Sequence, residues 1–313
     1  MLLALSLLSF IVTFLSTKLL IKKCHSNNLL SIDMHKPSKP KVADFGGLAV
    51  YFGLLIPLCI YAFQNPLALS IISAISIAAL LGFLGDIFKF SQKTNAILPI
   101  LAALPFFAAN IPTYIYFPFI GKINFGIFYY LLLLLGATGS ANAVNMLAGY
   151  NGIEATLSLL ITFGLLTMSI LQNSQIGITL SLIFISSLLA FLYFNFYPAK
   201  IFPGDSGTFL FGITLFSIAI TTKLEFFAVL LFALYFINAA LYFYTRVRGI
   251  KIQKFATVNK EGRLNVEHPS CLYYLLIKWF KPTEKQLLLI FFVLQLLITL
   301  AVPIIFMLSF NWG

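Results

Sequence analysis

The stretch LALSIISAISIAALLGFLG, residues 67–85, is followed directly by Asp86. It carries no charge and is long enough for an α-helix to cross a hydrocarbon core of about 30 Å. Its Leu, Ile and Ala residues follow one another without the alternation that is typical of a membrane β-strand. The stretch therefore predicts a membrane-spanning helix that ends at a carboxylate.

Similar apolar stretches fill most of the chain. The 313 residues are 60% hydrophobic and 9% charged, with a mean hydropathy of +0.99. Because no water-soluble fold buries so much apolar surface, we predict an all-α polytopic membrane protein with one domain over residues 1–313. About ten transmembrane helices are expected. Their ranges are 2–21, 46–64, 67–85, 96–110, 125–141, 154–171, 175–194, 207–221, 225–244 and 286–309.

The positive charges indicate the orientation. If the N-terminus is outside, all 20 Lys and Arg residues except Lys122 and Lys223 fall on the inner side. The positive-inside rule then predicts that both termini lie outside. Residues 2–21 lack a basic segment before them, so we expect this span to be retained. The cytoplasmic segments would be 22–45, 86–95, 142–153, 195–206 and 245–285.

The partners and metal chemistry are limited by composition. The net charge of +11 reflects the membrane asymmetry and does not suggest nucleic acid. The cysteines and histidines have no metal-ligand spacing, so we expect them to be structural or incidental and expect no disulfide. These residues are Cys24, Cys59, Cys271, His25, His35 and His268.

Four polar islands interrupt the apolar chain, at 85–93, 142–152, 203–207 and 245–248. All four lie in predicted cytoplasmic segments. Polar groups near hydrocarbon are costly and usually functional, so their gathering at one surface predicts a site there.

The first two islands differ in how strongly they indicate a functional site. Asp86 and Lys93 would share one helix face, either as a cap with neighbouring positive charge or as a site for a phosphate headgroup. The second island places Asn142, Asn145 and Asn151 between two apolar spans. Carboxamides both donate and accept hydrogen bonds, and the island is richer in them than a turn requires. Function is therefore favoured over turn chemistry.

The last two islands suggest phosphate chemistry. Asp205 lies near a predicted helix start, where it could act as a cap. An Asp flanked by glycines and preceded by Phe202 also suits a Mg²⁺ ligand beside a stacked base, since one or two carboxylates suffice for Mg²⁺. Arg246 and Arg248 are two of the three arginines. Arginine where lysine is the common cation indicates forked recognition of phosphate or a sugar carbonyl.

Two further acidic residues border the islands. Asp44 closes a Pro- and Lys-rich segment that predicts an extended, solvated connector, and it precedes Gly46 and Gly47 as a candidate ligand contact. Glu154 could simply lie at a helix N-terminus, where the dipole favours negative charge. The chain contains no Walker A loop, Gly-x-Gly-x-x-Gly fingerprint or Ser-His-Asp set that would favour another reading.

With NAVNMLAGYNGIE at residues 142–154 and FPGDS at 202–206, the chain resembles the polyprenyl-phosphate N-acetylhexosamine-1-phosphate transferases over nearly its whole length. Bacterial members tend to carry aspartates at the positions of Ala148 and Asn151. At these positions the chain resembles the archaeal and eukaryotic branch, which makes GlcNAc-diphospho-dolichol. Arg246 and Arg248 resemble that branch's sugar-nucleotide loop. The histidine cluster of the branch that uses UDP-MurNAc-pentapeptide is missing from the last loop, which argues against that donor.

The resemblance implies individual roles. Asp205 and Asn145 would coordinate Mg²⁺, or Mn²⁺ in its place, on the UDP diphosphate. Lys93 would meet the phosphates, and Asp86 would orient the lipid phosphate or Lys93. Phe202 would stack on uracil. The substrate-binding residues implied by the family are Asp44, Asn142, Gly149, Asn151, Glu154, Phe202, Arg246 and Arg248.

Two departures from the family pattern concern the first island. Gly85 replaces the first residue of an Asp-Asp pair, and Asn95 occupies an alternative slot for the downstream basic residue. The expected reaction remains transfer of GlcNAc-1-phosphate from UDP-GlcNAc to dolichyl phosphate, at the cytoplasmic face of the cell membrane.

Three alternatives stay open at this point. The acceptor could be undecaprenyl phosphate, as in bacterial cell-wall polymer synthesis. A transporter or lipid-binding protein is a more remote class, because it predicts ionisable residues at mid-bilayer depth, and the spans lack them there. The sequence allows a homodimer as well as a monomer.

Overall fold

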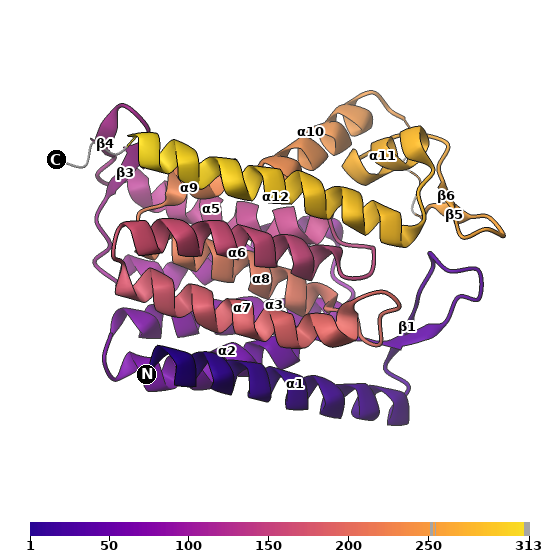
Figure 1. The fold of residues 1–313 in the computed structure, drawn as a ribbon, viewed down its shortest axis with the longest axis horizontal. Helices are drawn as coiled ribbons and strands as arrows, with labels where there is room; N and C mark the ends of the chain where they lie inside the picture. Colours follow the sequence, from indigo (N-terminus) through magenta and orange to yellow (C-terminus); the bar gives the residue numbers. More distant parts are fainter. Residues whose placement is uncertain (251–252, 254, 310–313) are drawn as a thin grey trace.

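The computed structural model describes residues 1–250, 253 and 255–309, and it shows helices lying side by side along the longest axis (Figure 1). Parts of the predicted segment 245–285 (residues 251, 252 and 254) and residues 310–313 lie outside the described residues. The helices are α1 (Leu2–Ser26), α2 (Gly47–Ala62), α3 (Leu67–Phe88), α4 (Gln92–Ile97), the 3₁₀ helix η1 (Leu98–Phe107), α5 (Phe128–Met146), α6 (Ile153–Leu171), α7 (Gln175–Asn195), α8 (Gly204–Thr221), α9 (Glu225–Leu231), α10 (Ala233–Val247), α11 (Leu272–Phe280) and α12 (Glu284–Ser309).

The apolar helices confirm a mostly helical, multi-pass membrane protein. Among the described residues, six helices are long and apolar enough to cross a membrane, or seven if the bent pair α9–α10 counts as one span. The six are α1, α3, α6, α7, α8 and α12. Each of the ten predicted ranges overlaps a helix of the bundle, but the number of crossings stays a prediction.

Two predicted spans are not continuous α-helices. In the range 96–110, α4 runs into η1, which has Pro99 at its start and Pro105 inside. Proline lacks an N–H group and therefore interrupts α-helical hydrogen bonding. In the range 225–244, α9 and α10 meet at a bend of 65°. There the buried Gln295 side chain donates through Nε2 to the carbonyl oxygen of Leu231 at 3.0 Å, which satisfies a carbonyl beside the break.

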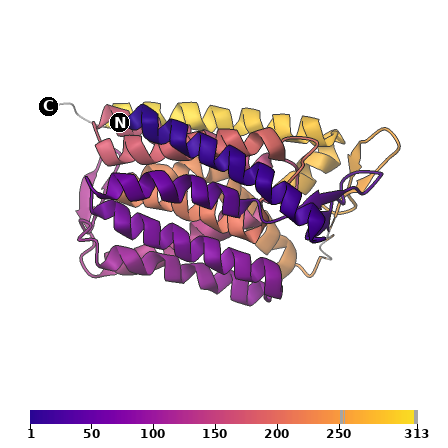
Figure 2. The ribbon, with the colours of Figure 1, turned by 90° about the horizontal axis from the view of Figure 1, so that it is seen from below.

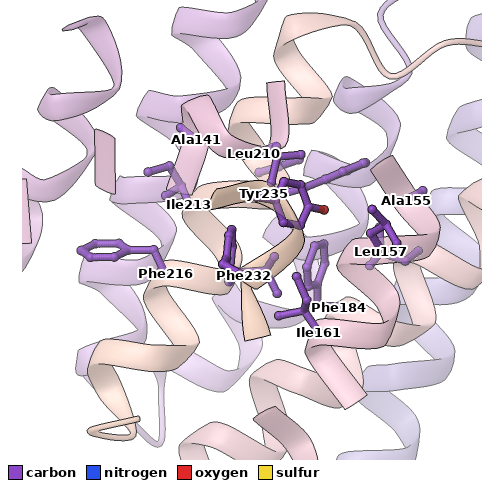
Figure 3. Close-up of a cluster of buried hydrophobic side chains, with 14 of the residues drawn as sticks. Ala141, Ala155, Leu157, Ile161, Phe184, Leu210, Ile213, Phe216, Phe232 and Tyr235 are labelled. Atoms are coloured by element: carbon purple, nitrogen blue, oxygen red, sulfur yellow. The ribbon is translucent and has the colours of Figure 1, made fainter. Parts of the chain in front are cut away.

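Helix α8 is the centre of the bundle, and its residues 206–220 are all buried. Figure 3 shows part of this core, where Phe184, Leu210 and Tyr235 converge from α7, α8 and α10. Glycine permits the close contact with α3, because a Cβ at Gly82 would lie only 2.4 Å from the carbonyl oxygen of Asp205. Small residues at helix contacts let the backbones approach, and this contact sets the start of α8 against the end of α3.

Short antiparallel hairpins distinguish the two ends of the bundle (Figures 1 and 2). One end, called the loop end below, carries two of them, and the opposite end carries the third together with the N-terminus and the C-terminal end of α12. The loop-end hairpins are β1 (Leu30–Ile32) with β2 (Lys41–Ala43) and β5 (Thr257–Val258) with β6 (Leu264–Asn265), and the third pairs β3 (Tyr114–Phe117) with β4 (Gly121–Asn124).

The hairpin β1–β2 corrects one expectation. The segment before Asp44 is solvated only in part: residues 37–39 and Lys41 are exposed, but the chain turns back on itself rather than running extended, and Asp33 and Lys36 are buried. The Lys36 ammonium forms ion pairs with Asp33 and with Glu284 at the start of α12. Proline and lysine composition predicted solvation, but this lysine is bound by two buried carboxylates, that of the neighbouring Asp33 and that of Glu284, which is distant in the sequence.

Candidate active site

The first and third polar islands meet where α8 begins. Gly204 opens this helix with a φ of +67°, a conformation that glycine adopts without strain. A Cβ at this position would lie 2.6 Å from Oδ2 of Asp86 and 3.2 Å from Oδ1 of Asp44. The close approach of the backbone therefore brings two carboxylates beside Asp205, the next residue in the chain.

Asp86 caps the N-terminus of α8. Its Oδ1 accepts a hydrogen bond from the backbone N–H of Asp205 at 2.8 Å, and its Oδ2 accepts one from the N–H of Ser206 at 3.1 Å. The first N–H groups of a helix lack partners within the helix, and negative charge is favoured beside them. Asp86 rather than Asp205 is therefore the cap, and it fixes the backbone that carries Asp205.

The Asp205 carboxylate is held by amides. Its Oδ2 accepts a hydrogen bond from Nδ2 of Asn95 at 2.9 Å, and the Asn145 side chain also bonds to it. Lys89 supplies positive charge near this carboxylate. Lys93, the predicted basic residue, is exposed on α4 and forms no ion pair in the part of the chain that the structure describes. Asn95, at the alternative slot, makes the contact instead.

A cavity of about 240 Å³ opens beside Asp205 at the loop end. Five of the predicted site residues line it, namely Asn145, Gly149, Glu154, Phe202 and Asp205. The lining also contains residues that the sequence did not single out, among them Asp33, Met34, His35, Tyr150, Asn195 and Phe255. The local sequence around His35 offered no signal for this position, since it depends on how the hairpin β1–β2 packs.

Buried polar atoms without a hydrogen-bond partner gather around this cavity. Among the described residues, four cavity-lining side chains carry such an atom: His35 Nε2, Tyr150 Oη, Glu154 Oε2 and Asn195 Oδ1. Oδ1 of Asn95, next to Asp205, is another. Leaving a buried donor or acceptor unpaired costs about 1–3 kcal/mol, and native proteins contain few of them. Their concentration here indicates a polar ligand.

Two predicted binding residues have partners within the protein. Nδ2 of Asn142 donates to the carbonyl oxygens of Ala96 and Thr138, each at 2.8 Å, which ties α5 to the end of α4. Oε1 of Glu154 accepts a hydrogen bond from the N–H of Gly149 at 2.8 Å. Glu154 thus lies in the first turn of α6, as expected, and also shapes the second island.

Asn151 is the node of a buried network. Its Oδ1 accepts hydrogen bonds from Nζ of Lys36 at 3.0 Å and from the N–H of Ala199 at 2.6 Å. Its Nδ2 donates to Oδ2 of Asp33 at 3.1 Å, and its N–H donates to Glu284 at 2.8 Å. The Asn151 amide therefore joins four segments of the loop end, and it does not line the cavity.

The fourth island also lies outside the cavity. Arg246 and Arg248 are exposed at the end of α10, the helix that diverges from the bundle in Figure 1. The Arg246 guanidinium donates to the hydroxyl of Tyr242 at 3.4 Å, and that of Arg248 lies 5.4 Å from the centre of the Tyr244 ring. Their substrate-binding role stays a prediction.

These features define a class, namely a multi-pass membrane protein with an acidic, amide-lined cavity at one end of its bundle. The model of glycosyl transferase family 4 matches residues 68–223, which include Asp86, Asn95, Asn145 and Asp205. Relatives that are about one-third identical match along almost the whole chain. The chain belongs to glycosyl transferase family 4.

Two archaeal relatives are assigned as UDP-N-acetylglucosamine–dolichyl-phosphate N-acetylglucosaminephosphotransferases. The one from Sulfolobus acidocaldarius is 33% identical, over 93% of this chain and 92% of its own. The one from Saccharolobus solfataricus is 32% identical, over 91% and 90%. A Bacillus subtilis protein assigned as an undecaprenyl-phosphate N-acetylglucosaminyl 1-phosphate transferase is 30% identical, over 58% of this chain and 52% of its own.

Proposed function

We propose that this enzyme transfers GlcNAc-1-phosphate from UDP-GlcNAc to dolichyl phosphate, forming GlcNAc-diphosphodolichol and UMP. The observation that carries the proposal is the Asp205 carboxylate, which borders the cavity while Asn95 and Asn145 hold it in place. Relatives assigned to the dolichyl reaction match 93% and 91% of the chain, whereas the relative assigned to the undecaprenyl reaction matches 58%. This difference supports the dolichyl acceptor.

The residues beside Asp205 fit a Mg²⁺ ion, with Mn²⁺ as a substitute. Mg²⁺ prefers oxygen ligands and needs only one or two protein carboxylates beside water and substrate phosphates. No group of three or more His, Cys, Asp or Glu residues with metal-binding geometry occurs among the described residues, which agrees with a site completed by the substrate. Asp205 and Asn145 would hold the ion. When bound, it would neutralise charge on the diphosphate.

The proposed reaction is a single displacement. An oxygen of the lipid phosphate forms a bond to the sugar-bearing phosphorus, while the bond from this phosphorus to the bridging oxygen breaks and UMP leaves. A phosphomonoester has a second pKa of about 6, so the attacking oxygen is already ionised at pH 7. A general base is therefore unnecessary, in agreement with an Asp86 carboxylate that is occupied by backbone N–H groups.

Positive charge near the diphosphate would come from lysine. Lys89 lies close enough to Asp205 to influence its carboxylate, and Lys93 follows on α4. Both lysines would stabilise negative charge on the diphosphate, since phosphoryl transfer depends mainly on positioning and charge stabilisation. Arg246 and Arg248 do not line the cavity, and their proposed contact with the nucleotide sugar rests on the family resemblance.

The proposal extends to the lipid chain of the acceptor and to the orientation of the protein in the membrane. An apolar cavity of about 410 Å³ between α5, α8 and α9 suits part of a polyprenyl chain. The N-terminus and the C-terminal end of α12 both lie opposite the loop end, which supports an even number of crossings with both termini on one side of the membrane. The candidate site would then face the cytoplasm in the cell membrane, where positive residues are favoured.

The test uses purified protein, UDP-GlcNAc labelled in the sugar, MgCl₂ and dolichyl phosphate, and it measures labelled lipid. Asp205→Asn is expected to lower product formation at least about a hundredfold, because it removes the charge of the metal ligand. Glu261→Gln is the matched control, since its side chain is 75% exposed in the β5–β6 turn. Full activity of Asp205→Asn would overturn the metal assignment. Parallel assays with undecaprenyl phosphate and UDP-GalNAc define the substrates.

A further inference from the structure

We propose that His35 contacts the bound nucleotide and accepts a hydrogen bond through Nε2 from an N–H or O–H of its nucleoside. The proposal deepens the function given above and rests on it. The sequence predicts an incidental His35, because no other cysteine or histidine lies at ligand spacing from it. The packing of the hairpin β1–β2 instead brings this side chain to the cavity wall.

The segment that carries His35 is anchored on both sides. Before it, Asp33 accepts a hydrogen bond from Nδ2 of Asn151 at 3.1 Å and another from the N–H of His35 at 3.2 Å. After it, Nζ of Lys36 donates to Asn151 at 3.0 Å and to Glu284 at 3.1 Å. All four anchoring side chains are buried. The backbone of His35 is therefore held in one position relative to the cavity.

Its ring is oriented by two further contacts. The imidazole stacks on the Tyr150 ring, with centroids 4.2 Å apart and planes 25° apart. It also forms a hydrogen bond with the backbone of Gly149. Because the Gly149 N–H already donates to Glu154, the Gly149 carbonyl is the partner, and the ring is the donor. Nε2 has no partner among the described residues, so Nδ1–H makes this bond.

The ring is consequently neutral, with its lone pair on Nε2. Burial lowers the pKa of His35 to about 4, and the nearby Lys36 charge acts in the same direction, while Asp33 opposes it. A neutral imidazole that donates through Nδ1 can only accept through Nε2. This nitrogen is buried and unpaired, and the residue is only 9% exposed. A ligand donor would remove the cost of that unpaired acceptor.

The position of His35 relative to the second island indicates which part of the ligand its side chain contacts. Asn145 contacts Asp205, where the diphosphate is proposed to bind, and the chain then runs to Gly149 and Tyr150 beside His35. The nucleoside end of the ligand would therefore point toward His35. Its donors are the uracil imide N–H and the ribose hydroxyls. The Phe255 ring lies edge-on to His35 at 5.9 Å, and it would turn aside to admit them.

The experiment compares His35→Phe, which keeps an aromatic plane against Tyr150 but lacks the acceptor, with His35→Gln, which restores an acceptor oxygen. Dissociation constants are measured for UMP, N3-methyl-UMP, 2′-deoxy-UMP and 3′-deoxy-UMP with the purified protein. We expect His35→Phe to weaken the binding of UMP about tenfold and His35→Gln to weaken this binding less. The analogue that lacks the donor should have the same dissociation constant for wild type and for His35→Phe.

If N3-methyl-UMP is the analogue that binds equally to both proteins, the donor is the uracil imide N–H. If it is a deoxy analogue, the donor is the ribose hydroxyl that this analogue lacks. Equal weakening of all four ligands by His35→Phe would overturn the proposal, because His35 would then only shape the cavity. Undiminished UMP binding by His35→Phe would overturn it as well. If His35→Phe does not fold, His35→Gln is compared with wild type. A loss of affinity on removal of one donor that is smaller in His35→Gln than in wild type supports the contact, and equal losses in both proteins for every analogue overturn it. Absence of UMP binding to wild type would instead contradict the proposed function.

Discussion

The backbone N–H of Asp205 donates a hydrogen bond to the carboxylate of Asp86 at 2.8 Å. The second carboxylate oxygen accepts from the next N–H group, that of Ser206. These bonds join the end of α3 to the start of α8, and they make the position of one acidic residue depend on the other. Asp86 is thus a positioning residue for the proposed metal ligand.

Asp86→Asn should lower activity about a hundredfold, because one acceptor oxygen is replaced by an amide that repels a backbone N–H and shifts Asp205. The pH profile of kcat/KM should keep its shape, since no catalytic proton is lost. Glu261→Gln serves as the exposed control. If the variant loses an ionisation from that profile, Asp86 acts as a base, and a phosphosugar bound covalently to Asp86 would identify it as a nucleophile.

Gly85 and Asn95 form a second coupled pair. A Cβ at Gly85 would lie 3.2 Å from Oδ1 of Asn95 and 3.4 Å from Oδ2 of Asp205. Gly85→Asp should therefore reduce activity by about tenfold or more, since it adds a like charge beside Asp205. Combining it with Asn95→Lys should recover part of the activity through the new positive charge. Gly85→Ala is the steric control, and an equal loss there would attribute the effect to volume rather than charge.

Lys36 should be important for stability. Lys36→Met leaves the buried carboxylates of Asp33 and Glu284 without their cation, which is expected to destabilise the loop end by about 3–5 kcal/mol. The midpoint of thermal unfolding in detergent measures the effect. Lys41→Met, at an exposed position of β2, is the matched control. Equal midpoints for the two variants would show that the buried network contributes little.

His35 should make stability depend on pH. Its pKa is about 4 in the folded protein and 6.5 in the unfolded chain, so the unfolded state binds more protons between these values. Stability should be unaffected above pH 7 and should fall as the pH drops below 6.5, by about 2 kcal/mol at pH 5. His35→Phe should remove this part of the pH dependence in thermal unfolding. A variant that keeps the full wild-type slope would assign the dependence to other groups.

Much of the fold class was predictable, and much of the site was not. Apolar stretches such as residues 67–85 predict membrane helices because the hydropathy of a span is a local property. The metal-binding roles of Asn145 and Asp205 were implied by the family resemblance and stay predictions, but the structure does bring the two side chains together. The network of Asn151 was not predictable, because its partners Lys36 and Glu284 lie 115 and 133 residues away along the chain.

The amino-acid sequence by itself determined a helical membrane protein of one recognisable family, with polar islands between apolar spans. Only the tertiary structure decided what each polar side chain does. Asp86 became a helix cap, Asn95 rather than Lys93 contacts Asp205, and His35 lines the cavity. The physical reason is that hydropathy acts along the chain, whereas hydrogen bonds are decided by whichever groups the packed helices bring within about 3 Å.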